Sequence, residues 1–223
     1  MPRIARVVIP NIPYHVTQRG NYQQDVFIDD KDKFKYLSLV KENSIEQNVE
    51  VLAYCLMKNH VHFALVPPKP DSLGKMFNQV SMRYSQYFNK KLGKRGHLWQ
   101  DRYFSCPLDE DHLYEVIRYI ENNPVTAGIV MSAEDYYWSS ARAHLFGKTF
   151  ENDLLADCFK YLRKIENWGD YLKEASRESI ILNLRRCTKS GRPAGGEDFI
   201  RDLEARVGRK LTAQPRGRPW PKK

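Results

Sequence analysis

Two histidines separated by one valine, His60 and His62, have the spacing that most directly suggests chemistry in this chain. They open the apolar run 60–66, which has the composition of a β-strand. Successive side chains of a strand point to opposite faces, so both imidazoles are predicted to share one face. Two neighbouring imidazoles supply half of a divalent-metal site. The pattern also fits a strand whose histidines are exposed or hydrogen-bonded.

A tyrosine and an asparagine lie one helical turn apart further along the chain. The sequence predicts a helix from His112 to Asn123, with acidic residues at its start and an apolar stripe facing the core. Tyr119 and Asn123 then occupy one shoulder of that stripe, from which side chains reach over the edge of the sheet. Pro124 is expected to end the helix.

Together these residues predict phosphodiester chemistry. His60, His62 and the amide oxygen of Asn123 form a mixed nitrogen and oxygen set that suits Mg²⁺ or Mn²⁺ and stays open to a phosphate. A bound metal would polarise the phosphodiester while Tyr119 attacks phosphorus. Phenols, with a pKa of about 10, are good leaving groups, so a phosphotyrosine bond keeps the energy needed to rejoin DNA. His15, on an earlier strand, is either a third ligand or a histidine hydrogen-bonded in place.

The surrounding elements predict an α+β fold. They follow the order strand, helix, strand, strand, helix, strand, which is the ferredoxin-like β-α-β-β-α-β pattern of two helices on an antiparallel sheet. The histidine strand is expected to be central, and the tyrosine helix follows this core. Gly20 is expected to take a positive φ in a turn. The predicted strands are 14–18, 49–56, 60–66 and one after the turn within 96–104, and two helices are predicted with N-caps at Asp30 and at Asp71 or Ser72.

Composition limits the class of protein. The 223 residues carry a formal net charge of +9, which suggests an anionic partner, with nucleic acid as the default. The four cysteines are widely spaced and form no C-x-x-C pair, which argues against a zinc ribbon or disulfide framework and fits a reducing cytoplasm. We see no signal peptide and no run approaching the roughly 18 apolar residues of a membrane span, so no membrane partner is expected.

The last third of the chain differs from the rest. We predict a catalytic domain over 1–149 and a helical, basic DNA-binding extension over 150–223. Residues 185–223 hold twelve Lys or Arg and four Asp or Glu, and 12 − 4 = +8 is nearly the whole net charge. Two Gly-Arg-Pro triplets there can lay an arginine into a minor groove, whereas the alternative is a solubilising tail. Helices are predicted over 154–162, over 171–184 and around Leu203.

Candidate DNA contacts are basic or imidazole side chains beside the predicted site, on the second helix and in the tail. They are Arg19, Arg83, Lys94, Arg95, His97, Arg102, Arg192 and Arg218.

Four stretches, 14–21, 56–62, 96–103 and 118–125, resemble the REP-associated tyrosine transposases of the single-tyrosine HUH (IS200-like) transposase family. The resemblance implies that His60 and His62 are metal ligands, that Tyr119 is the nucleophile and that Asn123 is a further ligand. It also implies the substrate, single-stranded DNA in or beside an imperfect hairpin of repetitive extragenic palindromes, and a 5′-phosphotyrosine intermediate. Relatives of this kind act as a monomer or a homodimer.

Two other classes of protein compete with this interpretation. A non-catalytic single-stranded nucleic-acid-binding protein with a ferredoxin-like sheet would use the same residues as contacts. A covalent protein–DNA adduct that requires a divalent metal distinguishes the enzyme from that module. A structural zinc protein is disfavoured, because closed zinc sites take four Cys or His ligands and no cysteine here is paired with the histidines.

Overall fold

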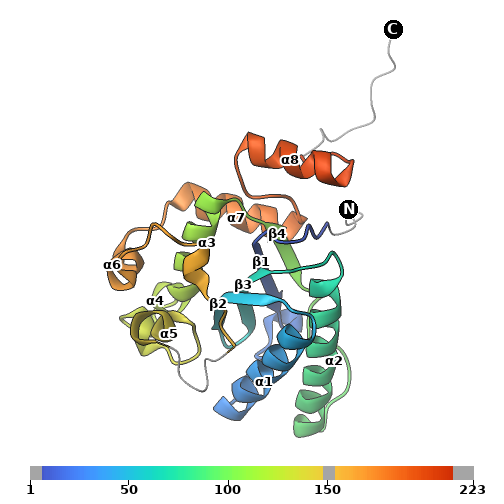
Figure 1. Ribbon diagram of the computed structural model, residues 1–223. Helices are drawn as coiled ribbons and strands as arrows, with labels where there is room; N and C mark the ends of the chain where they lie inside the picture. The colour runs from blue at the N-terminus through green and yellow to red at the C-terminus, as the bar shows by residue number, and fades with distance from the viewer. Residues whose placement is uncertain (1–6, 148–153, 213–223) are drawn as a thin grey trace.

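A four-stranded antiparallel sheet forms the centre of the computed structural model, which describes residues 7–147 and 154–212 (Figure 1). The strand order is β2-β3-β1-β4. The predicted α+β class, the β-α-β-β-α-β order and the central position of the histidine strand are confirmed. The strands are β1 (Tyr14–Arg19), β2 (Glu50–Leu56), β3 (His60–Val66) and β4 (Phe104–Pro107).

Helices α1 (Asp30–Glu46) and α2 (Ser72–Leu92) cover one face of the sheet and bury its aromatic side chains (Figure 1). The cap of α1 is Asp29, one residue before the predicted cap, because its carboxylate accepts a hydrogen bond from the backbone N–H of Asp32 at 3.1 Å. Helix α2 ends at Gly93, whose φ of 61° is the left-handed conformation typical of a helix stop.

The opposite face of the sheet is covered by a second layer of helices. The expected arrangement, two helices packed on an antiparallel sheet, lacked this layer. Helix α3 (Glu110–Glu121) packs on β2 and β3, and α7 (Glu178–Ser190) packs on β4 and β1. The C-terminal segment therefore supplies half of a second helical layer. Shorter elements complete the chain: α4 (Asn123–Thr126), α5 (Ala141–Phe146), α6 (Trp168–Lys173) and the 3₁₀ turns Asn21–Gln23, Ala133–Asp135 and Cys158–Lys160.

The predicted end of the tyrosine helix was wrong by two residues. Helix α3 ends at Glu121, and Asn122, with ψ of 1°, breaks the helical path. A new turn, α4, then begins with Pro124 near its start, where its missing N–H breaks no intrahelical hydrogen bond. Asn123 therefore belongs to the turn after α3 and not to α3 itself.

The segment before β4 also differs from the prediction, because regular strand begins only at Phe104. Residues 96–103 run as an irregular connection beside the end of β1, with one bridge between Gly20 and Trp99. Gly20 has φ of −60°, so the predicted positive φ was wrong. Glycine is required for a different reason, since a Cβ there would lie 2.3 Å from the carbonyl oxygen of Gln24.

In the C-terminal third, the helix predicted over 154–162 reduces to a single 3₁₀ turn, and the one predicted over 171–184 is two helices, α6 and α7. Helix α8 (Glu197–Val207) is confirmed, and its Leu203 packs with Ile9 and Leu211. The predicted division at 149/150 falls outside the described residues. No described helix has the length and hydropathy needed to cross a membrane.

Candidate functional site

The four residues predicted to do chemistry line one cavity of about 650 Å³, over the face of the sheet covered by α3 and α7. His60 and His62 lie side by side on β3, with ring centroids 4.9 Å apart. The ring of Tyr119 stands edge-on to that of His62, with centroids 5.5 Å apart. The structure therefore brings together His60, His62, Tyr119 and Asn123, which come from β3, α3 and α4.

His62 is held by a chain of buried hydrogen bonds. Its Nδ1 lies 3.0 Å from Nε2 of His15, and Nδ1 of His15 lies 2.8 Å from Oγ1 of Thr188 on α7. Of the two roles left open for His15, the structure shows the hydrogen-bonded one. If each ring donates from Nδ1, the chain runs from His62 through His15 to Thr188 and leaves Nε2 of His62 with a free lone pair.

His60 is oriented in a similar way by its neighbour. Its Nδ1 lies 2.6 Å from the side-chain oxygen of Asn59, which can only accept, so Nδ1 carries the proton. Burial and the charge of Arg19 lower the pKa of His60 to about 4. Burial also lowers the pKa of His62 well below its ordinary value. Both rings are therefore neutral near pH 7, the form in which imidazole binds a metal.

Asn123 keeps a fixed relation to Tyr119 although the two belong to different helices. Its Nδ2 donates a 2.9 Å hydrogen bond to the backbone carbonyl of Tyr119. The amide oxygen of Asn123 remains available in the cavity that both residues line. The guanidinium of Arg185, on α7, lies 5.7 Å from the centre of the Tyr119 ring.

Three cations line the same cavity: Arg19 at the end of β1, and Arg185 and Lys189 on α7. No acidic side chain lines it, and none of the three forms an ion pair within 7–147 and 154–212. Arg19 was among the predicted DNA contacts, whereas Arg185, Thr188 and Lys189 were not predicted to belong to the site. They lie beyond the end of the helix predicted over 171–184, so their spacing of three and four residues places them on one face only because α7 continues to Ser190.

The donor set fits a divalent metal that shares its coordination with substrate. In the part of the chain that the structure describes, no group of three or more His, Cys, Asp or Glu side chains could hold a metal by itself. The histidine cavity instead offers two imidazole nitrogens and one amide oxygen. The other coordination positions are left for water or phosphate oxygens, as is common for Mg²⁺ and Mn²⁺.

Comparison with known proteins identifies the family. The sequence model described as "Transposase IS200 like" matches residues 8–123, which is 123 − 8 + 1 = 116 of 223 residues and more than half of the chain. The chain belongs to the IS200-like transposase family. The matched range contains His60, His62, Tyr119 and Asn123, so the resemblance noted in the sequence is confirmed.

Two individual relatives of this IS200-like transposase carry more specific names than the family does. A curated protein of Haemophilus influenzae named as a REP-associated tyrosine transposase is 24% identical over 171 residues, covering 69% of this chain and 89% of that protein. A solved structure of a REP-associated tyrosine transposase bound to a REP hairpin superposes with a TM-score of 0.51 at 19% identity. That match covers 68% of this chain and 90% of the solved chain, and at this identity it supports the fold.

The residues that flank Tyr119 fasten α3 of the transposase to α6. Nε of Arg118 donates to the Tyr171 carbonyl at 2.9 Å, and Nδ2 of Asn122 donates to the Leu172 carbonyl at 2.8 Å. Glu121 is fully buried and accepts a 2.8 Å hydrogen bond from the indole of Trp168. The sequence analysis assigned no role to these neighbours. They fix the helix from one side, while Tyr119 lies in the cavity beside His62.

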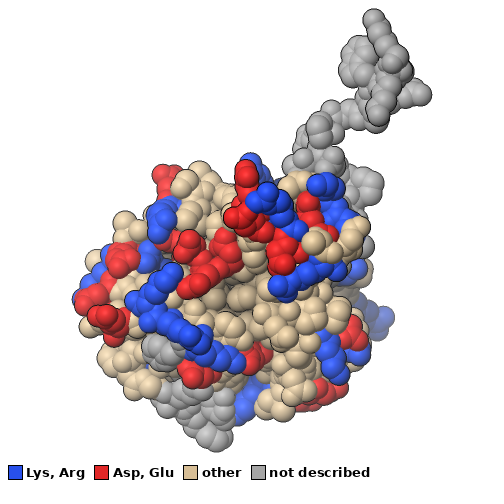
Figure 2. Space-filling view, turned by 45° about the horizontal axis from the view of Figure 1, so that its top comes forward, with Lys and Arg blue, Asp and Glu red and all other residues tan. Residues whose placement is uncertain are grey.

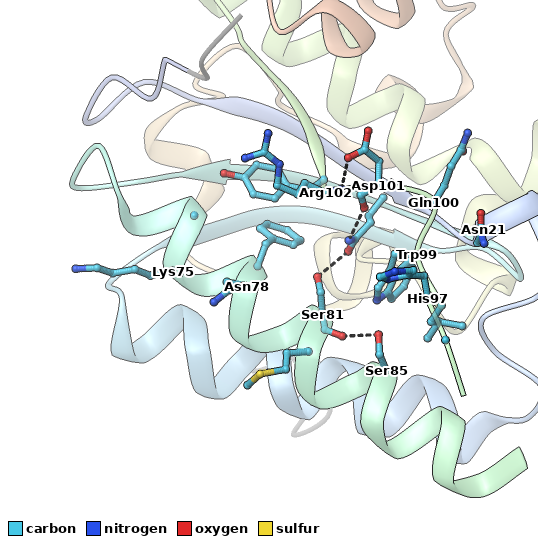
Figure 3. Close-up of a pocket in the computed structure, with 17 residues that line it drawn as sticks. Asn21, Lys75, Asn78, Ser81, Ser85, His97, Trp99, Gln100, Asp101 and Arg102 are labelled. Carbon is cyan, nitrogen blue, oxygen red and sulfur yellow. Dashed lines mark hydrogen bonds between the residues drawn. The ribbon is translucent and has the colours of Figure 1, made fainter. Parts of the chain in front are cut away.

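The other predicted DNA contacts are dispersed. His97 and Arg102 line a second cavity (Figure 3), and Lys94 and Arg95 are exposed in the connection after α2. Arg83 pairs with Glu42 at 2.5 Å, and Arg192 donates a 3.4 Å hydrogen bond to the Leu211 carbonyl. Arg218 lies outside the described residues. Contact of each of these side chains with DNA stays a prediction.

Proposed function

We propose that this transposase cleaves and rejoins single-stranded DNA at hairpin sequences of repetitive extragenic palindromes, with Tyr119 as the nucleophile. The observation that carries the proposal is the histidine cavity, where a tyrosine meets two neutral imidazoles and three cations without any carboxylate. Such a cavity favours an anionic phosphodiester over a cationic or neutral ligand. The hairpin substrate is supported by the similar solved structure, which is bound to a REP hairpin.

In the proposed reaction, the side chains of Arg19, Arg185 and Lys189 bind the phosphate oxygens. The phenol oxygen of Tyr119 forms a bond to phosphorus, and the bond from phosphorus to the 3′ oxygen breaks. The phenolic proton passes, directly or through water, to that oxygen. The products are a DNA end with a 3′-hydroxyl and a 5′-phosphotyrosine. Attack by a 3′-hydroxyl in the reverse sense rejoins the strand and restores the phenol.

His60, His62 and the amide oxygen of Asn123 are the residues that would hold Mg²⁺ or Mn²⁺. A divalent metal bound there would stabilise the negative charge that grows on the phosphate oxygens during attack. The hydrogen bonds that the two rings donate, from Nδ1 of His60 to Asn59 and from Nδ1 of His62 to His15, would keep the ligand nitrogens aimed at it.

A cleavage assay with labelled hairpin DNA and Mn²⁺ tests this proposal. The wild type should release a fragment with a 3′-hydroxyl and retain the other fragment through a bond that resists denaturant. Tyr119→Phe should bind the hairpin but neither cleave nor retain DNA. Tyr114→Phe is the matched control, because Tyr114 lies on α3 outside the cavity and its hydroxyl contacts the Lys164 backbone N–H at 3.1 Å.

The contrasting result is specific binding with no cleavage by the wild type in Mn²⁺ or in Mg²⁺. That outcome would support a non-catalytic single-stranded nucleic-acid-binding protein built on the same sheet.

A further inference from the structure

The hydrogen bonds that begin at His62 continue past Thr188 to a cysteine on β4. Oγ1 of Thr188 lies 2.8 Å from Nδ1 of His15 and 3.2 Å from the sulfur of Cys106. The ring planes of His15 and His62 are within 10° of each other, as an N–H···N bond in the plane of both rings requires. Side chains of β3, β1, α7 and β4 are therefore joined in one series that runs from the histidine cavity into the core.

The series is closed off from water behind the cavity. His62 is 6% exposed, His15 and Thr188 are each 3% exposed, and Cys106 is fully buried. In the part of the chain that the structure describes, the hydroxyl of Thr188 has no acceptor other than His15 and Cys106. Burial raises the pKa of the Cys106 thiol to about 12, so this group is a neutral thiol that can either donate or accept.

Such a series has two possible directions, which hold the same number of protons. In the first, His62 donates from Nδ1 to His15, and His15 donates from Nδ1 to Thr188. The Thr188 hydroxyl then donates to the sulfur of Cys106, and Nε2 of His62 keeps its lone pair. In the second, every bond is reversed, and the hydrogen of His62 lies on Nε2, facing the cavity. Imidazole binds a metal through a nitrogen lone pair, so only the first direction leaves Nε2 ready for one.

The charges of the histidine cavity favour the first direction. Three cations and no acidic side chain line this cavity. The lone pair is the negative end of a neutral imidazole, so the cations attract it, whereas they repel an N–H that points at them. The first direction also requires an acceptor for the Thr188 hydroxyl that is not His15. Cys106 supplies that acceptor.

We propose that Cys106 is a positioning residue of the site, because its sulfur accepts the Thr188 hydroxyl and so keeps His62 in the tautomer with a free Nε2. Without this acceptor, the Thr188 hydroxyl donates to Nδ1 of His15, the series reverses, and His62 presents an N–H to the cavity. A metal then binds only after that hydrogen is moved. The inference rests on the proposed function, since it concerns a proposed metal ligand.

Nuclear magnetic resonance of the histidine rings tests the proposal on the full-length protein without metal. Long-range ¹H–¹⁵N spectra distinguish a ring protonated on Nδ1 from one protonated on Nε2. In the wild type, His62 should carry its hydrogen on Nδ1, and in Cys106→Ala on Nε2. Cys106→Val also lacks the acceptor and suits a strand, so it should behave like Cys106→Ala. Cys106→Ser retains an acceptor and should restore the wild-type tautomer.

Calorimetric titration with Mn²⁺ measures the consequence for metal binding. Cys106→Ala and Cys106→Val should bind Mn²⁺ about ten-fold more weakly than the wild type, and Cys106→Ser within about two-fold of it. Cys55→Ala is the matched control. Cys55 is also a fully buried thiol and pairs with His62 across β2 and β3, but its sulfur contacts Sδ of Met57 at 3.6 Å. Its replacement should change neither the tautomer nor the affinity.

The proposal is overturned if His62 keeps the wild-type tautomer in Cys106→Ala and Cys106→Val, or if Cys106→Ser does not restore it. Equal loss of Mn²⁺ affinity in Cys106→Ala and Cys55→Ala would also overturn it, because the loss would then come from packing. Mn²⁺-dependent cleavage by the wild type, without any change of tautomer in the variants, would contradict the role of Cys106 alone. A change of tautomer with no Mn²⁺ binding by the wild type would contradict the proposed metal site and leave the role of Cys106 standing.

Discussion

At the scale of single residues, the site depends on hydrogen bonds that orient its ligands. His62 reaches the cavity through Nε2 only because Nδ1 is engaged by His15, and His15 in turn by Thr188. Thr188 lies on α7, so a residue from the C-terminal third of the chain takes part in the hydrogen bonds that orient His62 on β3. If His62 binds the metal as proposed, this series of hydrogen bonds would make the metal affinity depend on Thr188, a side chain that does not touch the metal.

Thr188→Val removes the hydroxyl with little change of volume and should weaken Mn²⁺ binding about ten-fold, the lower end for loss of such a partner. Isothermal titration calorimetry with Mn²⁺ measures this effect without any DNA. Thr17→Val is the control, because Thr17 lines the same cavity but its hydroxyl donates to the Val61 carbonyl at 2.8 Å. Equal affinity of Thr188→Val and wild type would show that the chain does not orient His62.

At the scale of elements, α3 is held against α5 and α6 by a buried charged cluster. Glu121 is fully buried and accepts hydrogen bonds from Ser140, from the Trp168 indole and from Nδ1 of His144, the last at 2.6 Å. Burial alone would lower the pKa of His144, but the carboxylate of Glu121 and the neighbouring Cys158 raise it to about 10. The imidazolium therefore persists at neutral pH and pairs with the carboxylate.

This cluster predicts a loss of stability in alkali. The pKa of His144 is higher in the folded than in the unfolded chain, so its stabilisation is complete below pH 6.5 and is lost as the pH rises through about 10. The free energy of unfolding in urea should fall by on the order of a few kcal/mol more for wild type than for His144→Gln between pH 7 and pH 10. If the free energy of unfolding falls equally with pH in wild type and His144→Gln, the ion pair between His144 and Glu121 is contradicted.

The elements also show which parts of the site were predictable. Alternation along β3 placed His60 and His62 on one face, because that pattern is local. Tyr119 and Asn123 were expected together on one helix, whereas they line one cavity from α3 and α4, joined by the hydrogen bond from Asn123 to the Tyr119 carbonyl. The role of Arg185 was not predictable, since no local pattern says that α7 packs across β1 and β4. For the same reason the bond from His15 to His62 was left open, because it depends on the register that pairs Thr17 with His62.

At the scale of the whole molecule, the net positive charge is unevenly distributed along the sequence. On the face seen in Figure 2, acidic and basic side chains are interspersed. Charged side chains of α8 form ion pairs within the helix. Nε of Arg206, for example, lies 2.9 Å from a carboxylate oxygen of Asp202. Residues 185–212 carry eight cations and four acids, a balance of 8 − 4 = +4. The remaining four cations of the extension lie in 213–223, outside the described residues.

The C-terminal extension is predicted to increase the affinity for DNA. Removal of residues 213–223 alone is the best test of this prediction. A truncation within α7 would strip Thr188 from the site, whereas Leu211 is the last described core residue. Loss of four cations should lower the slope of log K against log salt by up to about 3, with the melting temperature unchanged. An unchanged slope would mean that these residues do not neutralise DNA phosphates.

The proposed reaction joins Tyr119 covalently to DNA, and peptide mapping of the protein–DNA adduct is the most direct test of that bond. Wild-type protein is incubated with hairpin DNA and Mn²⁺, denatured, digested with nuclease and protease, and analysed by tandem mass spectrometry. We expect a nucleotide attached through a 5′-phosphate to the tyrosine at position 119, and no adduct in Tyr119→Phe. An adduct on any other residue, or one that persists in Tyr119→Phe, would contradict the proposed reaction.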